Sequence, residues 1–198
     1  GFDPEEEGPI LNLHLKRAAR RAGVKLIVAH PREIELTQYE GPYLGYRPGT
    51  EATLLNGLTR LALEAGAEDD GILNDLIAGA SNEQLANFCA VDVEAAREAA
   101  KLLVESEHAL IAYGPMAAKS GSEVRNGLTN LALLTGHDNF LSYIGLDANS
   151  QGCRDMGLLP DALPGHAGLD DQAALQRFES AWGAELPTEA GKTYEQML

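Results

Sequence analysis

Helical and strand-like hydrophobic patterns alternate along this chain of 198 residues, and that alternation limits its possible folds more than any other feature. From Pro9 to Ala22, apolar residues recur at helical spacing; Gly23 ends the pattern, and residues 24–29 form a short β-rich run. A helix joined by a short turn to a buried strand is half of a βαβ unit. The sequence therefore predicts an α/β fold, a mostly parallel sheet with flanking helices, followed by a loop-rich segment.

Further elements are predicted along the rest of the chain. Strands are expected near residues 43–46 and 108–113, parallel to the first. Helices are expected to carry these groups of apolar residues: Leu54, Leu58, Leu61 and Ala62; Ile72, Leu73, Leu76 and Ile77; Leu85, Phe88 and Cys89; Ala95, Ala99, Leu102 and Leu103, which are expected to face inward; Val124, Leu128, Leu131 and Ala132; Leu175, Phe178 and Trp182. Thr50 is predicted to cap the helix that follows it, a contribution of about 1 kcal/mol.

Residues 149–164 show neither helical nor strand periodicity, and four glycines and prolines interrupt them. We expect an ordered loop whose apolar residues Met156, Leu158 and Leu159 are buried against the α/β domain or a neighbouring domain. The predicted division is an α/β domain over residues 1–145, truncated at its N-terminus. Residues 146–198 would form a long loop plus a helix, leading into a further domain of a longer parent protein.

Charge and composition exclude several classes of function. The net charge of −15 argues against a nucleic-acid partner, and no apolar run is long enough for direct membrane insertion. Seven of the 15 basic and seven of the 30 acidic residues lie in residues 1–47, so eight basic and 23 acidic residues follow. This acidic excess is either a solvated surface or a docking surface for a complementary subunit.

Neither the cysteines nor the histidines are spaced like metal ligands. Cys89 and Cys153 are far apart, and the five histidines form no pair at i, i+2 or i, i+4. No Ser/His/Asp arrangement can be defended from sequence either. We therefore predict no metal ligands and no catalytic residues within these 198 residues.

Four segments are predicted to lie at the carboxyl ends of the strands, where ligands bind in open α/β sheets. They are Asp3-Pro4, His30-Pro31-Arg32, Pro48-Gly49-Thr50-Glu51 and Gly114-Pro115-Met116. The third segment leads into a helix N-terminus, where free backbone N–H groups favour an anion.

Two stretches carry a resemblance to a known family. Residues 149–165 read Asn-Ser-Gln-Gly-Cys-Arg-Asp-Met-Gly-Leu-Leu-Pro-Asp-Ala-Leu-Pro-Gly, and residues 177–183 read Arg-Phe-Glu-Ser-Ala-Trp-Gly. Together they resemble the molybdopterin oxidoreductase superfamily, which includes formate dehydrogenases, assimilatory nitrate reductases and the G-type subunit of bacterial NADH-quinone oxidoreductase. The resemblance spans nearly the whole chain. It implies that the four segments match turns that hold a pterin guanine dinucleotide, with these cofactor-binding residues: Asp3, Pro4, Arg32, Gly49, Thr50, Glu51 and Gly114.

The chain departs from the family pattern at several of these places. His30 and Glu51 stand where the family has Asp, residues 114–119 lack the family's Gln-His pair, and Arg154 replaces a Cys of formate dehydrogenases. Such changes leave ligand groups unpaired, so the resemblance implies a vestigial site that binds no cofactor.

The pattern is most similar to that of the G-type subunit in respiratory complex I. The resemblance then implies a scaffold fragment of a large peripheral-arm subunit, in an electron-transfer chain from NADH to quinone over the parent's iron–sulfur clusters. Its partners would be other domains and subunits of that complex, on the cytoplasmic side and peripheral to the inner face of the cell membrane.

Two alternatives remain open. The chain could be the same fragment of a catalytic molybdenum enzyme such as formate dehydrogenase, binding a molybdopterin guanine dinucleotide. It could also be a protein-interaction module unconnected with redox chemistry.

Overall fold

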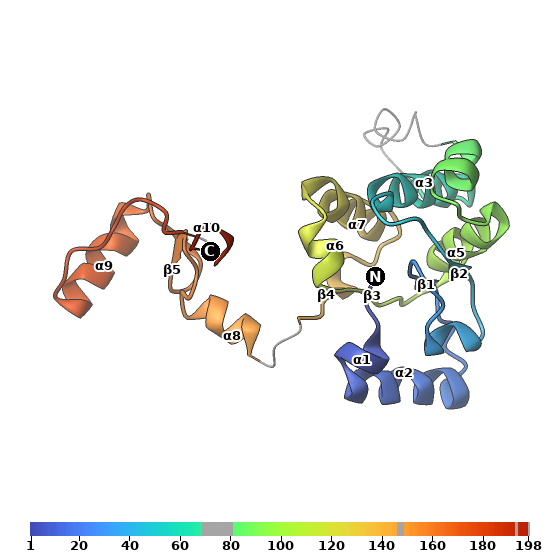
Figure 1. Ribbon diagram of the computed structural model, residues 1–198, viewed down its shortest axis with the longest axis horizontal. Coiled ribbons are helices and arrows are strands. Elements are labelled where there is room, and N and C mark those ends of the chain that lie inside the picture. The colour runs from blue at the N-terminus through green and yellow to red at the C-terminus, as the bar shows by residue number, and fades with distance from the viewer. Residues whose placement is uncertain (69–80, 146–148, 193, 198) are drawn as a thin grey trace. The chain divides into compact units, whose positions relative to one another are not determined.

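A computed structural model describes residues 1–68, 81–145, 149–192 and 194–197 (Figure 1). The chain divides into two compact units, Gly1–Leu146 and Asp147–Leu198. None of the helices within the described ranges is long and apolar enough to cross a lipid bilayer.

Helices dominate the first unit, and its strands are short. In chain order its elements are α1 (Pro4–Glu7), α2 (Pro9–Ala22), β1 (Val28–Ala29), η1 (Glu35–Gln38), β2 (Tyr43–Leu44), α3 (Glu51–Glu64), η2 (Gln84–Phe88), α5 (Val93–Glu105), β3 (Ile111–Tyr113), α6 (Pro115–Lys119), α7 (Ser122–Leu134), η3 (Asp138–Phe140) and β4 (Leu141–Tyr143). In Figure 1 the strands lie between α2 and the layer that contains α3 and α7.

The strands form two parallel pairs. Strand β1 pairs with β2, with Val28 opposite Tyr43, and β3 pairs with β4, with Ile111 opposite Leu141. The predicted α/β class with parallel strands is confirmed. The strands are shorter than predicted, however, and β4 was not predicted at all, because three residues are too few to display an alternating pattern.

The main core forms where α3 packs against α5 and α7 (Figure 1). The apolar faces predicted for α3 and α7 are buried throughout: Leu54, Leu58, Leu61, Ala62, Val124, Leu128, Leu131 and Ala132. Burial of each leucine contributes roughly 1.5–3 kcal/mol, so this three-helix contact dominates the stability of the unit.

Two glycines allow helices to approach closely in this core. A Cβ atom on Gly57 of α3 would lie 2.5 Å from Cδ2 of Leu85, which is fully buried in η2. A Cβ atom on Gly127 of α7 would lie 3.1 Å from Cβ of Leu55. Glycine is unfavourable inside a helix, so its presence here reflects the space that the neighbouring helix requires.

The two short helices predicted within residues 70–90 have different outcomes. The first, with Ile72 to Ile77, lies outside the described residues. The second is the π-helix η2, which contains Leu85 and is followed directly by Cys89, and both of these side chains are buried. Phe88 is the last residue of this helix, and its side chain is 52% exposed.

The second unit contains α8 (Ser150–Asp155), the antiparallel pair β5 (Ala162–Leu163) and β6 (Ala167–Gly168), α9 (Gln172–Trp182) and α10 (Tyr194–Met197). Helix α9 was predicted. Its N-terminus is capped by Asp171, which accepts hydrogen bonds from the N–H groups of Ala173 and Ala174. A small core holds the unit together through Leu163, Ala174 and Leu175.

The predicted absence of a helix from residues 149–164 is wrong. Helix α8 begins there, with the N–H of Cys153 donating to the carbonyl of Asn149 at 2.9 Å. Six residues are too few to show an apolar face, so the sequence pattern could not reveal it. Met156 and Leu158 are each 73% exposed, and their burial against another domain of the parent stays a prediction.

We expect Gly57→Ala to destabilise the chain. Alanine favours a helix by about 1 kcal/mol, but the new methyl group overlaps Leu85, and overpacking typically costs about 1–3 kcal/mol. Urea unfolding followed by circular dichroism measures the change. The double variant Gly57→Ala/Leu85→Ala is the control, because removal of the leucine side chain makes room for the new methyl group. The double variant should therefore lose less free energy of unfolding than the two single variants lose together. An unchanged midpoint for Gly57→Ala would contradict the packing.

Candidate functional site

Residues 1–3 bring three of the four predicted segments together, those at Asp3, Arg32 and Gly114. Asp3 accepts a hydrogen bond from Arg32, which follows β1, at 3.1 Å. Phe2 packs on Gly114, which follows β3: a Cβ atom on that glycine would lie 3.0 Å from Cβ of Phe2. The topology therefore places Asp3, Arg32 and Gly114 in one neighbourhood.

Asp3 is engaged in structural contacts on both of its oxygens. Its buried side chain accepts from the N–H of Glu5 at 3.1 Å, which caps α1, and from Nη2 of Arg32 at 3.1 Å. The N–H of Asp3 donates to the Glu7 carboxylate at 2.9 Å, so the cap is reciprocal. Pro4 is buried at the first position of α1. These two predicted ligand residues thus build the start of a helix.

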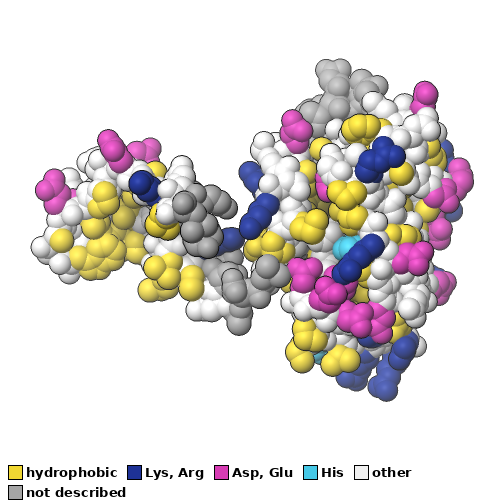
Figure 2. Space-filling view, in the orientation of Figure 1, with side chains coloured by type: hydrophobic (Ala, Val, Ile, Leu, Met, Phe, Trp, Pro, Cys, Tyr) yellow, Lys and Arg dark blue, Asp and Glu magenta, His cyan; other side chains and the backbone are white. Residues whose placement is uncertain are grey.

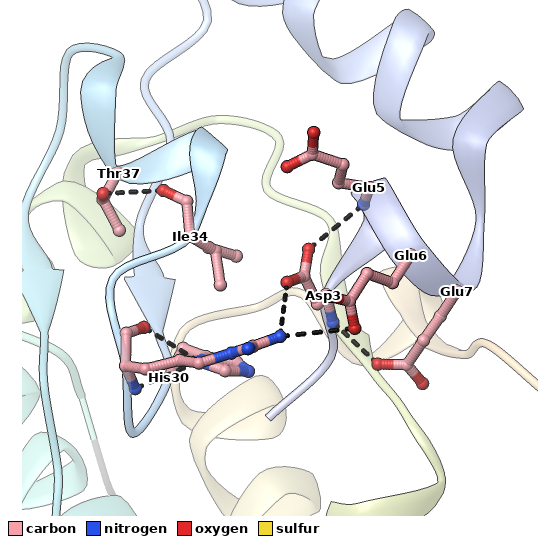
Figure 3. A network of polar contacts seen from close by, with 8 residues as sticks. Asp3, Glu5, Glu6, Glu7, His30, Ile34 and Thr37 are labelled. Atoms are coloured by element: carbon pink, nitrogen blue, oxygen red, sulfur yellow. Dashed lines mark hydrogen bonds and ion pairs between the residues drawn. The ribbon is translucent and has the colours of Figure 1, made fainter.

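Arg32 is neutralised by two carboxylates of the chain, those of Asp3 and Glu6, which Figure 3 shows side by side at the start of α1. Its Nη2 lies 3.1 Å from Oδ2 of Asp3 and 3.3 Å from Oε2 of Glu6. An open hollow beside this group is lined by one arginine and five acidic residues: Asp3, Glu5, Glu6, Glu33 and Glu35. A diphosphate placed here would face a net negative wall and an arginine that is already paired, so these residues do not fit the phosphates of a dinucleotide.

His30 is turned toward its own backbone. Its Nδ1 lies 2.8 Å from the carbonyl oxygen of Arg32 and 3.2 Å from the nitrogen of Arg32, and its carbonyl accepts from the Tyr43 hydroxyl at 3.1 Å. Burial lowers the pKa of His30 below its ordinary value, although the hydrogen bond with Arg32 acts in the opposite direction. The imidazole is thus buried, and its Nδ1 already contacts the backbone of Arg32. It cannot offer a ligand the acceptor oxygens of the carboxylate that the family has at this position.

The segment from Arg47 to Thr50 forms a tight turn. The N–H of Thr50 donates to the carbonyl of Arg47 at 3.2 Å, and Gly49 has φ of 86°, as a type II turn requires. The hydroxyl of Thr50 donates to the same carbonyl at 2.7 Å. The prediction that Thr50 caps α3 with its side chain is therefore wrong, because the turn has engaged the hydroxyl.

The N-terminus of α3 consequently has no side-chain cap. Its free N–H groups favour a negative charge, and Glu51 places a carboxylate in the first turn. Burial, together with the charge of Glu51, raises the pKa of Tyr46 to about 12. The helix end therefore suits an anion, although a carboxylate of the chain already stands there.

Sequence reasoning missed the contacts that anchor this turn. The N–H of Arg47 donates to the carbonyl of Cys89 at 2.8 Å, and its guanidinium donates to the carbonyl of Phe88 at 3.1 Å. The thiol of Cys89 lies 3.8 Å from the carbonyl of Thr50, and burial raises the pKa of this thiol. The position of Cys89 on an apolar face was the one sign that it makes an interior contact. No sequence pattern indicated that this contact is with the turn at Arg47 and Thr50.

The remaining positions that depart from the family pattern lie in helices. Residues 115–119, where the Gln-His pair is missing, form α6, and Arg154 lies in α8 of the second unit. Across residues 1–68, 81–145, 149–192 and 194–197, no group of three or more His, Cys, Asp or Glu side chains is arranged to hold a metal ion.

Comparisons with known proteins agree on one family. Residues 1–189 match the family model described as molybdopterin oxidoreductase. The chain is 32% identical over 204 residues to the NADH-quinone oxidoreductase subunit named G 2 of Rhizobium meliloti, with 100% of the chain and 23% of that protein covered. It is 30% identical over 209 residues to formate dehydrogenase H of Escherichia coli, with 96% of the chain and 29% of that protein covered. The chain thus spans less than a third of the length of these relatives.

A solved structure supports the fold. Acetylene hydratase from Pelobacter acetylenicus superposes with a TM-score of 0.58 over 66% of this chain and 20% of that chain. The two sequences are 20% identical in the matched region, so the likeness concerns the fold alone.

We expect the stability of the protein to fall as the pH drops below about 6.5, partly because of His30. The folded pKa of His30 is lowered, so between that pKa and the unfolded value the unfolded state binds more protons. Urea unfolding at several pH values between 7 and 5 measures the slope. His30→Gln cannot titrate and should show a shallower slope, and equal slopes would contradict the buried, neutral imidazole.

The two thiols should differ in reactivity. Cys89 is fully buried and its thiol pKa is raised, whereas Cys153 is partly exposed. A thiol reagent added to the native protein should modify Cys153 first and Cys89 only after unfolding, as peptide mass mapping would record. Protein in denaturant, in which both thiols react, is the control. Equally fast modification in the native state would show that the turn and η2 separate readily.

Proposed function

This chain belongs to the molybdopterin oxidoreductase family, and we propose that it is a scaffold segment of a G-type NADH-quinone oxidoreductase subunit with a vestigial pterin site. In this proposal the parent protein is part of a complex that passes electrons from NADH to quinone over iron–sulfur clusters held elsewhere in the complex. The segment supports the fold and contacts other domains and subunits, peripheral to the inner face of the cell membrane.

The observation that carries the proposal is the pairing of Arg32 with Asp3 and Glu6. A phosphate that drew Nη2 of Arg32 away would have to break both contacts. The carboxylate of Asp3 is buried, and a buried group left unpaired costs roughly 1–3 kcal/mol, more when it is charged. The chain thus already provides the counter-charges that a cofactor would otherwise supply.

The substitution at position 30 supports the same conclusion. The imidazole of His30 contacts the backbone of Arg32 and is buried, so it offers no carboxylate to a nucleotide base. Two neighbouring positions of the expected ligand set are therefore engaged within the chain. Their effects on cofactor affinity should accumulate, because each leaves a separate ligand group unpaired.

One observation favours the second candidate, a catalytic molybdenum enzyme such as a formate dehydrogenase. The N-terminus of α3 has no side-chain cap, so N–H groups beside Gly49 and Thr50 could hold a diphosphate. A bound molybdopterin guanine dinucleotide would supply the redox chemistry, and these residues would orient it. The similarity to formate dehydrogenase H is comparable to that with the Rhizobium meliloti subunit. Glu51 weighs against this candidate, because its carboxylate occupies the first turn.

The third possibility, an interaction module without redox chemistry, has no support from the family. The matched model covers residues 1–189 and describes an oxidoreductase.

Metal and pterin analysis of the full-length parent tests the proposal. We expect the protein, purified with its native clusters, to contain neither molybdenum nor tungsten by mass spectrometry and no fluorescence of oxidised pterin. A molybdenum-containing formate dehydrogenase purified in the same way is the positive control. Near-stoichiometric pterin in the parent would overturn the vestigial site and favour the catalytic candidate.

A further inference from the structure

The outer face of α2 carries an exposed stripe of mixed character. Ile10, Leu13, Arg17 and Arg21 follow one another at spacings of three and four residues, which places them on one side of the helix. Ile10 is 69% exposed and Leu13 is 62% exposed. The opposite side packs inward, where Leu15 contacts the small core around Val28, Ile34 and Leu36. We call these four residues the α2 stripe.

The two arginines of the α2 stripe are unusual in this chain. Neither Arg17 nor Arg21 has an ion-pair, hydrogen-bond or ring partner in the part of the chain that the structure describes. The other eight arginines contact a carboxylate, a carbonyl, an aromatic ring or another group of the chain: Arg20, Arg32, Arg47, Arg60, Arg97, Arg125, Arg154 and Arg177. In a protein with a net charge of −15, two adjacent unpaired guanidinium groups call for an explanation.

Helix stability explains only part of this pattern. A cation in the last turn interacts favourably with the negative end of the helix dipole, which accounts for Arg21. It does not account for Arg17, which lies a turn earlier, or for two large apolar side chains exposed on the same face. In Figure 2 hydrophobic and basic side chains lie next to one another over α2.

We propose that the α2 stripe is a docking site for a carboxylate-bearing surface of a partner subunit. Arginine guanidinium groups pair with carboxylates through two parallel hydrogen bonds, and Arg is enriched at the centres of protein interfaces. Ile10 and Leu13 supply apolar contact at one end of the stripe, while Arg17 and Arg21 select an acidic surface at the other.

The charges around the stripe favour a protein over a membrane or a nucleic acid. Glu5 and Glu6 are exposed in α1, directly before the apolar end of the stripe. These carboxylates would repel anionic lipid headgroups and phosphates, and two apolar side chains are too few to anchor a helix in a bilayer. A folded protein surface, by contrast, can present its carboxylates to Arg17 and Arg21 and keep them away from Glu5 and Glu6.

That the partner is another subunit rests on the proposed function. The docking test is nevertheless independent of cofactor content, since pterin in the parent would overturn the vestigial site and leave the α2 stripe unaffected.

Site-specific photo-cross-linking in the assembled complex tests the inference. Leu13 of the full-length parent is replaced by benzoylphenylalanine, cells are irradiated, and the cross-linked peptides are identified by mass spectrometry. We expect a cross-link to another subunit, in a segment that exposes Asp or Glu. Adding Arg17→Glu and Arg21→Glu should lower its yield at least about tenfold, because like charges would then meet at the interface. Lys101→Glu with Lys119→Glu, an equal charge change at exposed positions elsewhere, is the matched control and should leave the yield unchanged.

Four results would overturn the proposal. These are cross-links to lipid, cross-links within the same polypeptide only, no cross-link at position 13, and a cross-link to another subunit that survives reversal of both arginines. Restoration of the yield by changing the partner's identified Asp or Glu to Lys, in the Arg17→Glu/Arg21→Glu background, would show that the two charges meet directly.

Discussion

The packing of α3 against α5, α7 and η2 is the interaction on which the rest of the first unit depends. The close contact between Gly57 and Leu85 sets the distance between α3 and η2. The end of η2 then holds the turn before α3, through hydrogen bonds from Arg47 to the carbonyls of Phe88 and Cys89. Side-chain packing in the core thus positions a backbone turn at the candidate site, which links stability to the geometry of that site.

Electrostatics organise the opposite side of the site. Arg32 lies between two carboxylates of the chain, and one of them, Asp3, also caps α1. A side chain that stabilises a helix start and neutralises an arginine cannot easily be released to a ligand. The basic residues on the outer face of α2 are arranged differently, since Arg17 and Arg21 have no partner among the residues that the structure describes. One arginine is therefore occupied within the fold, and two are available for contact with another molecule.

The sequence predicted the helices far better than the strands. The apolar faces of α3 and α7 repeat over 13 or 14 residues, long enough for the helical period to stand out. Strand β4 and helix α8 have three and six residues, and such short elements carry no readable period. The βα order predicted that the segments at Asp3, Arg32 and Gly114 would meet. The predicted ligand roles stay predictions for all seven residues: Asp3, Pro4, Arg32, Gly49, Thr50, Glu51 and Gly114.

By itself the sequence determined the α/β class, the apolar faces of the long helices α3 and α7, the acidic net charge and the resemblance to one family. These properties depend on periodicity, composition and residue order, all of which are local or additive along the chain. Only the tertiary structure decided that the Thr50 hydroxyl closes a turn, that Arg32 pairs with Asp3 and Glu6, and that Cys89 lies under the turn at Arg47. Each of these contacts competes with a plausible alternative partner, and the distances that decide between them exist only once the chain has folded.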